Sequence, residues 1–143
     1  MHFADASAIV ARYVQEPRSA IVRSWLADAP VAVSRLSEVE VASALARLCR
    51  ENRLSRRSRD RAIATFAADL ASWYVVEITA AITSSARRLL VRHALRSGDA
   101  IQLASALWLQ QATDSPIEGV LALDDRLITA AQAERLPITS SAR

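Results

Sequence analysis

Short apolar segments alternate with longer helical patterns along this chain, and this alternation restricts the fold more than any other feature. The short segments cover residues 2–4, 31–34, 74–78 and 120–123. Strands that alternate with helices need crossover connections, which give a mostly parallel sheet with helices on both faces. Only two Gly and four Pro are present, which disfavours a turn-rich β-sandwich. We therefore predict one α/β domain over residues 1–143, with three α/β/α layers around a central, mostly parallel, four- to five-stranded sheet.

Helix starts are marked by residues that can cap exposed backbone N–H groups. The expected helices have approximate bounds of 7–14, 17–27, 36–51, 55 or 58 to 72, 79–93, 97–109 and 126–134. Ser7, Thr79 and Ser97 are the expected caps of three of these helices. Either Ser55 or Ser58 is the expected cap of a fourth.

Two further expectations concern packing and the edge of the sheet. In the helix expected to end near residue 72, apolar residues recur at three- or four-residue spacing and should face the core. These residues are Ile63, Phe66, Ala67 and Leu70. Residues 136–139 combine a proline with β-branched neighbours, so they could add a fifth strand at an edge, where proline is tolerated.

The charge and cysteine content restrict the partners and the compartment. All 18 basic residues are arginine, and with 15 acids they give a net charge of +3 and a pI of about 10.0. This balance permits a polyanionic partner without requiring one. Cys49 is the single cysteine, which excludes an intramolecular disulfide and is typical of a reducing compartment. No apolar run approaches the ~18 residues that span a bilayer. The N-terminal residues also lack the basic segment followed by an apolar segment that is typical of a secretory signal peptide. We expect a cytoplasmic protein that does not contact the membrane.

Carboxylates gather near the predicted strand ends, where open α/β sheets bind ligands. Asp5 and Asp124 each follow a strand. Glu38 and Glu40 begin the helix after the second strand, and Asp99 begins another helix. Taken singly, Asp5 and Asp99 are explained as helix caps and Glu40 as a solvated helix residue. Acids from four segments at one sheet edge would repel each other unless a cation lies between them. Mg²⁺ and Mn²⁺ prefer such oxygen ligands and can promote phosphodiester hydrolysis.

Four short motifs, each centred on one acid, are distributed over nearly the whole chain. They are Phe3-Ala4-Asp5-Ala6-Ser7-Ala8, Ser34-Arg35-Leu36-Ser37-Glu38-Val39-Glu40-Val41, Leu95 to Ala106, and Leu121 to Leu127. Their order and separation resemble those of the PIN-domain ribonucleases, and most closely the VapC-type toxins of bacterial toxin–antitoxin pairs. In the register of the family, Glu40 rather than Glu38 is the acid of the second motif. The spacing to Leu127 favours Asp124 in the fourth motif, but Ala122 replaces the family's frequent Ser or Thr, so Asp125 stays an alternative.

The resemblance implies a PIN-like fold and a metal-dependent endoribonuclease that acts as the toxin of a toxin–antitoxin pair. The family's catalytic acids and metal ligands correspond to Asp5, Glu40, Asp99 and Asp124. Ser7 and Asp125 would support these acids from the surrounding shell. The implied cofactor is Mg²⁺ or Mn²⁺, and the implied partners are an RNA substrate, a cognate VapB-type antitoxin and a second copy of the chain. The resemblance leaves open the RNA target, the cleavage sequence and whether one or two metals bind.

Other functions are compatible with acids at the ends of parallel strands. One is a receiver-like phosphoacceptor, although the chain has no lysine to contact a phosphoryl group. Another is a catalytically silent PIN-like protein that binds RNA or a partner, which Ala122 favours. The arginine-rich segment 50–61 is interpreted either as a solvated helical hairpin or as an RNA contact. The tryptophans are expected in the core or a dimer interface, with base stacking as the alternative. Neither His93 nor Cys49 has the spacing of a zinc site.

Overall fold

A sheet of parallel strands forms the centre of the computed structural model, which describes residues 1–27, 29–114 and 116–139. The strands are β1 (His2–Ala4), β2 (Val31–Ser34), β3 (Tyr74–Val76) and β4 (Gly119–Leu121). They lie in the order β3-β2-β1-β4, and His2 of β1 lies opposite both Val31 and Gly119. Every residue of β2 and β4 is buried, as expected for parallel strands covered on both faces. All four strands therefore end at the same edge of the sheet.

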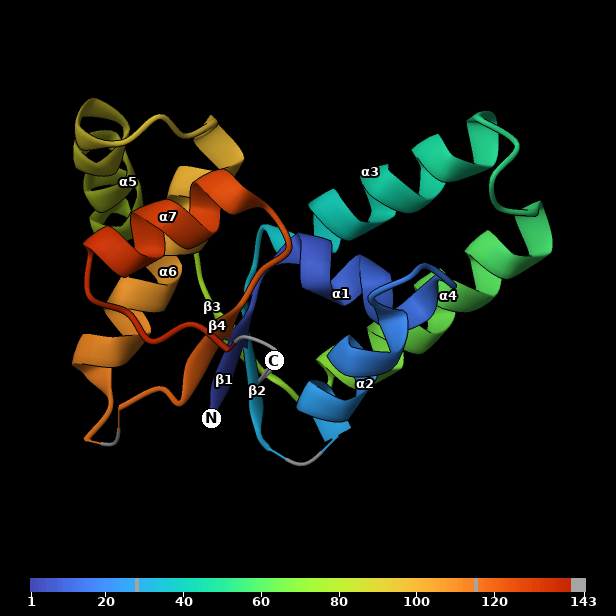
Figure 1. Ribbon diagram of the computed structural model, residues 1–143, viewed down its shortest axis with the longest axis horizontal. Helices are drawn as coiled ribbons and strands as arrows, with labels where there is room; N and C mark the ends of the chain where they lie inside the picture. The colour runs from blue at the N-terminus through green and yellow to red at the C-terminus, as the bar shows by residue number, and fades with distance from the viewer. Residues whose placement is uncertain (28, 115, 140–143) are drawn as a thin grey trace.

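Helices cover both faces of this sheet (Figure 1). One layer contains α1 (Ala6–Tyr13), α2 (Ser19–Ala27), α3 (Ser37–Arg50) and α4 (Arg56–Leu70). The other layer contains α5 (Ala80–Arg92), α6 (Ser97–Ala112) and α7 (Asp125–Ala133). The predicted three-layer α/β/α fold with a parallel sheet is confirmed. Within the described residues, no helix combines the length and the apolar character needed to cross a membrane.

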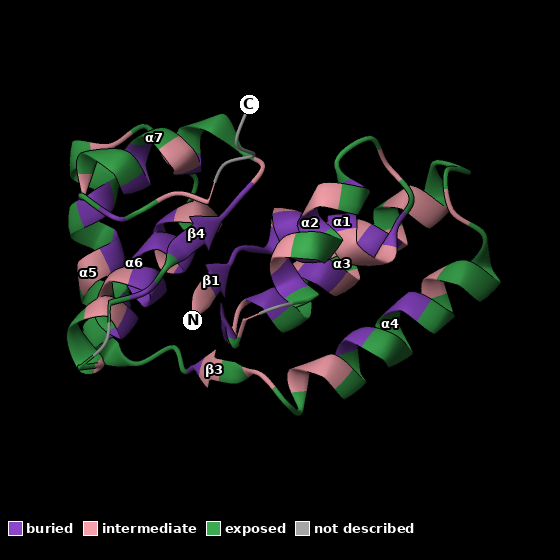
Figure 2. Cartoon of the chain, turned by 60° about the horizontal axis from the view of Figure 1, so that its bottom comes forward, coloured by how far each residue is buried: buried purple, intermediate pink, exposed green. Residues whose placement is uncertain are grey.

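Each helical layer packs on the sheet through its own apolar core. Phe3 belongs to the core shared with α5, α6 and α7, whereas its neighbour Ala4 belongs to the core shared with α1 to α4. Successive residues of a strand point to opposite faces, which explains this division. Leu45 and Leu103 are fully buried, one in each core, and truncating either to alanine is expected to cost about 2–5 kcal/mol. Figure 2 shows the buried residues along the strands and the inward faces of the helices.

Helices α3 and α4 form a hairpin that extends beyond the sheet (Figure 1). Ser55 caps α4 and Thr79 caps α5 by accepting backbone N–H groups at 3.0 and 3.4 Å, as predicted. In α4, Phe66 is buried, but the prediction that Ile63 and Ala67 face the core is wrong, because both are exposed. Helix α4 packs on α3 and α1 rather than on the sheet, so its buried stripe is narrower than the sequence pattern suggested.

Helices α1 and α6 begin differently from the prediction. Asp5, not Ser7, occupies the cap position of α1, and the Ser7 hydroxyl bonds elsewhere. Arg96, not Ser97, occupies the cap position of α6. The carboxylate of Asp99 accepts the Arg96 N–H at 3.2 Å, so the first turn is stabilised without a capping serine.

The remaining differences concern short segments at the sheet edge. Helix α2 begins at Ser19 rather than at Pro17, and β4 ends two residues earlier than predicted. The predicted fifth strand at residues 136–139 is reduced to an isolated parallel bridge between Val120 and Ile138. The edge beside β4 is thus covered by a single bridge instead of a full strand.

Candidate active site

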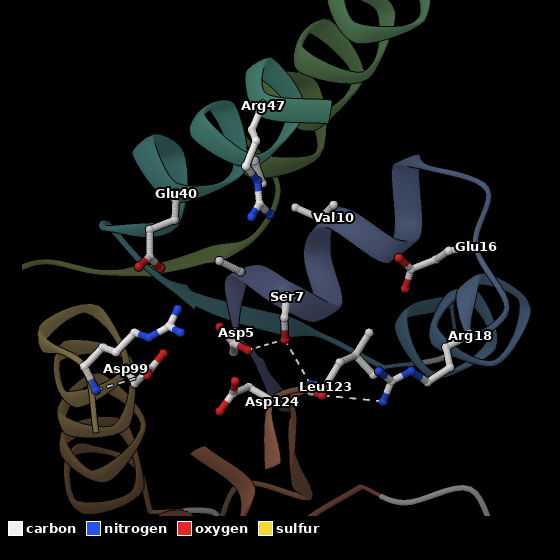
Figure 3. A pocket seen from close by; sticks show the side chains of 13 residues that line it. Asp5, Ser7, Val10, Glu16, Arg18, Glu40, Arg47, Asp99, Leu123 and Asp124 are labelled. Atoms are coloured by element: carbon white, nitrogen blue, oxygen red, sulfur yellow. Dashed lines mark hydrogen bonds between the residues drawn. The ribbon is translucent and has the colours of Figure 1, made fainter. Parts of the chain in front are cut away.

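A cavity of about 470 Å³ opens at the sheet edge where β1 and β4 end. Its walls come from α1, α3 and the start of α6, from the segment between α1 and α2, and from the segment between β4 and α7 (Figure 3). All the acids predicted to act together line it, namely Asp5, Glu40, Asp99 and Asp124. Glu38 and Asp125, the alternative acids of two motifs, lie outside its described lining. The structure therefore brings the four predicted carboxylates from four distant segments into one cavity. A fifth carboxylate, that of Glu16, also lines it and was not predicted.

Asp5 is the most buried of these acids, with 5% of its surface exposed. Burial raises its pKa to about 7, although hydrogen bonds from Ser7 oppose this rise by stabilising the carboxylate. The charges of Glu40 and Asp99 raise the pKa further. Asp5 is therefore a carboxyl group that holds its proton near neutrality unless positive charge is brought close to it.

The Ser7 hydroxyl connects Asp5 to the far end of the chain. Its Oγ donates to Asp5 Oδ2 at 2.5 Å and accepts the backbone N–H of Leu123 at 2.9 Å. Leu123 immediately precedes Asp124, so one side chain fixes the first acid and the segment that carries the fourth (Figure 3). This double contact explains why Ser7 is not available to cap α1.

Glu40 projects from the first turn of α3 into the cavity (Figure 3). Its pKa is raised chiefly by burial and further by the charge of Asp99, while a hydrogen bond from Gln102 opposes the rise. That bond joins Gln102 Nε2 to Glu40 Oε2 at 2.7 Å. Glu38 instead accepts a hydrogen bond from Arg35 at 2.5 Å on the protein surface. The geometry thus separates Glu40, which lines the cavity, from Glu38, which forms a surface ion pair.

Asp99 and Asp124 combine a helix-capping role with a place in the cavity wall. Asp99 Oδ2 accepts the Arg96 N–H, and Asp124 Oδ1 accepts the N–H groups of Arg126 and Leu127 at 3.0 and 3.1 Å. In the described part of the chain, the second oxygen of each carboxylate has no hydrogen-bond partner. Helix N-termini favour negative charge, so both acids are held in place with an oxygen to spare for a ligand.

Sequence reasoning missed several residues that line or support the cavity. Gln102 interrupts an otherwise apolar stretch of α6, and this interruption is the sequence signal of its contact with Glu40. Arg18, Arg47 and Arg96 also line the cavity, and Figure 3 shows Arg47 pointing into it from the same helix as Glu40. Their role depends on tertiary packing, and the arginine-rich composition of the chain conceals it.

Other residues considered from the sequence have local partners. His93 Nε2 lies 2.7 Å from Glu134 Oε1, and Arg59 Nη1 lies 3.9 Å from the Cys49 sulfur. Trp73 packs on Phe66 with ring centroids 6.2 Å apart, in agreement with the expected core role. Asp125, expected to support the acids, faces a different cavity that His93 also lines.

The donor set fits a hard divalent cation by its chemistry, because carboxylate oxygens are the ligands that Mg²⁺ and Mn²⁺ prefer. Within the described residues, none of the four acids forms an ion pair with a basic side chain. Also within those residues, no group of three or more His, Cys, Asp or Glu side chains already has the arrangement of a metal-ion site. Cation binding would therefore require the carboxylates to adjust their side-chain conformations around the cavity.

Comparison of the whole chain with known proteins identifies the family to which it belongs. The model of the PIN domain family matches residues 3–133, which include all four acids. The chain belongs to the PIN domain family. This membership removes the receiver-like alternative, and PIN domains generally use divalent metal ions.

Relatives of this PIN domain include two proteins of Mycobacterium tuberculosis. Ribonuclease VapC45 of strain CDC 1551 / Oshkosh and ribonuclease VapC49 of strain ATCC 25618 / H37Rv are each 35% identical to it over 130 residues. Those alignments cover 90% of this chain and 88% of each relative. The crystal structure of VapC20, a sarcin–ricin loop cleaving toxin of the same species, has a TM-score of 0.68 at 24% identity and covers 91% of this chain and 95% of its own. That structure supports the fold, and the closer sequences support the predicted VapC-type resemblance.

Proposed function

We propose that this PIN domain is a metal-dependent endoribonuclease that hydrolyses RNA phosphodiester bonds as the toxin of a toxin–antitoxin pair. The observation that carries the proposal is the cavity that Asp5, Glu40, Asp99 and Asp124 line together. In the described part of the chain, none of these four acids is paired with a basic side chain. The VapC ribonucleases that resemble this chain over 90% of its length support the same activity.

The acids that would hold Mg²⁺ or Mn²⁺ are Asp5, Glu40, Asp99 and Asp124. When bound, such an ion supplies Lewis-acid polarisation of the phosphate and lowers the pKa of water. Ser7 and Gln102 hold two of the acids by hydrogen bonds. The first turns of α6 and α7 hold the other two, Asp99 and Asp124. The chain itself thus brings oxygen ligands together at one edge of the sheet. Around Asp5, the buried member of the set, charge interactions are strong.

Arginines on the cavity wall provide the positive charge that an RNA backbone needs. Arg18, Arg47 and Arg96 line the cavity together with the acids, and guanidinium groups bind phosphate oxygens in a bidentate manner. Arg47 follows Glu40 by two turns of α3, which corresponds to about 10 Å along the helix axis. We assign Arg47 to a phosphate that neighbours the cleaved bond rather than to that bond itself.

We also propose that the chain forms a homodimer, is inhibited by a VapB-type antitoxin and acts in the cytoplasm. Val39 and Val91 are 67% and 88% exposed, so both α3 and α5 offer apolar side chains to a second chain. Light scattering of the purified protein tests the dimer, and co-expression with the product of an adjacent reading frame tests the antitoxin.

The direct test of the proposed activity uses the purified chain and total cellular RNA. We expect cleavage with Mg²⁺ or Mn²⁺, loss of cleavage with EDTA, and recovery when the metal is restored. Mapping of the new RNA ends identifies the target. Equal cleavage in EDTA would contradict metal dependence, and the absence of cleavage and of RNA binding with either metal would contradict the proposed function.

A further inference from the structure

The buried amide of Gln102 has an unusual hydrogen-bond balance. Its side chain is 1% exposed and lies in α6 among apolar neighbours. Nε2 donates to Glu40 Oε2 at 2.7 Å and to Ser37 Oγ at 3.1 Å. Oε1 is buried and has no hydrogen-bond partner among the described residues. Both N–H groups are therefore used and the carbonyl group is left unsatisfied.

This arrangement is not explained by stability. A buried carbonyl without a partner lowers the stability of the folded state, whereas an apolar side chain of the same size would avoid that cost. Rotating the amide by 180° would place Oε1 against the Glu40 carboxylate, where two acceptors repel. The orientation is thus fixed by Glu40 and Ser37, and its unsatisfied carbonyl is the consequence.

We infer that Gln102 is a positioning residue that holds the Glu40 carboxylate at its place in the metal-binding cavity. This inference rests on the proposed function. Gln102 fixes Oε2 of Glu40, while Gly98, one turn earlier in α6, lies against Oε1. Asp99 lies in the same helix between these two contacts. One rigid helix therefore carries one acid and fixes the position of a second.

The geometry predicts which properties depend on Gln102. The amide lies behind the Glu40 carboxylate and is not among the described residues that line the cavity. Its loss should loosen a metal ligand without removing any contact to RNA. Metal affinity and kcat should fall, and KM for RNA should not change.

The test replaces the amide by an apolar side chain of similar length, Gln102→Met. We expect the metal-free variant to remain folded with a melting temperature close to that of the wild type. The unsatisfied carbonyl is removed, which offsets the hydrogen bonds lost to Glu40 and to buried Ser37. Its Mn²⁺ affinity, measured by calorimetry, and its kcat should each fall about tenfold, as for other residues that support metal ligands. Ser105→Ala is the matched control. Ser105 is another buried polar residue of α6, and its Oγ lies 3.1 Å from Ser34 Oγ, away from the acids, so its loss should leave Mn²⁺ affinity unchanged.

A second measurement does not depend on activity. In ¹⁵N–¹H spectra of the metal-free wild type, we expect the Gln102 side-chain amide protons to exchange slowly with water and to shift in Glu40→Ala. Gln102 protons that do not respond to Glu40→Ala would overturn the inference, as would Gln102→Met with wild-type Mn²⁺ affinity and kcat. If Gln102→Met does not fold, Ser37→Ala replaces it as the test. This variant removes the Ser37 hydroxyl that accepts a hydrogen bond from the Gln102 amide, and the loosened amide should still weaken Mn²⁺ binding; unchanged binding would overturn the inference.

Failure of the proposed function has a different result. A wild-type protein that neither binds Mn²⁺ nor cleaves RNA would contradict the proposed function, whereas the amide spectra would still test the contact between Gln102 and Glu40.

Discussion

Gly98, in the first turn of α6, lies directly against the carboxylate of Glu40 in α3. A β-carbon at position 98 would lie 2.3 Å from Glu40 Oε1, which is closer than van der Waals contact permits. The glycine is therefore required by space, since its φ is not positive. The absence of one side chain in α6 allows an acid from α3 to reach the cavity.

Replacing Gly98 by alanine is expected to reduce RNA cleavage while leaving the stability of the fold nearly unchanged. Alanine favours a helix over glycine by about 0.5–1 kcal/mol, and the group it displaces is the end of a flexible side chain. We predict a folded Gly98→Ala protein with a melting temperature close to that of the wild type and RNA cleavage reduced at least tenfold. A variant that unfolds at the wild-type temperature and cleaves at the wild-type rate would show that the displaced Glu40 position is not needed.

The protonation of Asp5 predicts how the free energy of unfolding of the metal-free protein depends on pH. Its pKa is 3.8 without the protein environment and about 7 in the folded protein, so the folded state binds the proton more tightly. Between about pH 4 and pH 7, folded protein binds more protons than unfolded protein, and stability must fall as pH rises. We expect Asp5→Asn to reduce this decline, with the remainder due to Glu40, whose pKa is also raised, and to stabilise the metal-free protein by about 2–4 kcal/mol at pH 8.

Urea unfolding in EDTA at several pH values measures this effect. At pH 8, added Mn²⁺ should raise the free energy of unfolding of the wild-type protein, because a bound cation offsets the cost of burying the Asp5 charge. The same addition should stabilise Asp5→Asn much less. Parallel pH dependences of the two metal-free proteins would show that Asp5 does not hold its proton near neutrality.

Arg47 and Arg50 form a matched pair on α3 for testing RNA binding. Arg47 lines the cavity, whereas Arg50, the last residue of the helix, is exposed and lies outside the described lining. We expect Arg47→Gln to raise KM for RNA about three- to tenfold and to reduce the salt dependence of binding, as loss of a phosphate contact does. Arg50→Gln should have little effect. Equal effects of both variants would indicate general electrostatic attraction rather than a contact in the cavity.

Asp124 and Asp125 provide a second matched pair, adjacent in sequence. Asp124 lines the cavity, and Asp125 faces the neighbouring cavity beside His93. Asparagine can replace aspartate as a helix cap, so Asp124→Asn should fold normally and lose about a hundredfold or more in cleavage. Asp125→Asn should cleave within about threefold of the wild type. The reverse result would assign the fourth acid to Asp125, the alternative that Ala122 left open in the sequence.

Much of the fold was predictable because it depends on patterns within short segments. Runs such as Val31–Ser34 identify buried strands, and the alternation with helices requires a parallel sheet. The same logic places Asp5 and Asp124 at one edge, because both follow strands that end there. The family resemblance then selects Glu40 over Glu38, and the structure agrees in placing only Glu40 in the cavity.

The parts that were not predictable depend on contacts between distant residues. Ser7 has the sequence context of a helix cap, yet its hydroxyl binds Leu123, 116 positions away. Gln102 meets Glu40 across 62 positions, so its role is not visible in the pattern of α6. Ile63 fits a helical stripe but is 38% exposed, because the α3–α4 hairpin leaves the sheet.

The most direct test of the four-carboxylate site is cleavage of RNA by Asp99→Asn. Asparagine retains an oxygen for the Arg96 N–H and removes one charge, so the fold, checked by circular dichroism and thermal unfolding, should persist. We predict Mn²⁺ binding weakened at least tenfold and metal-dependent cleavage below detection, with RNA binding retained. A folded Asp99→Asn protein that cleaves RNA at the wild-type rate would contradict the proposed mechanism.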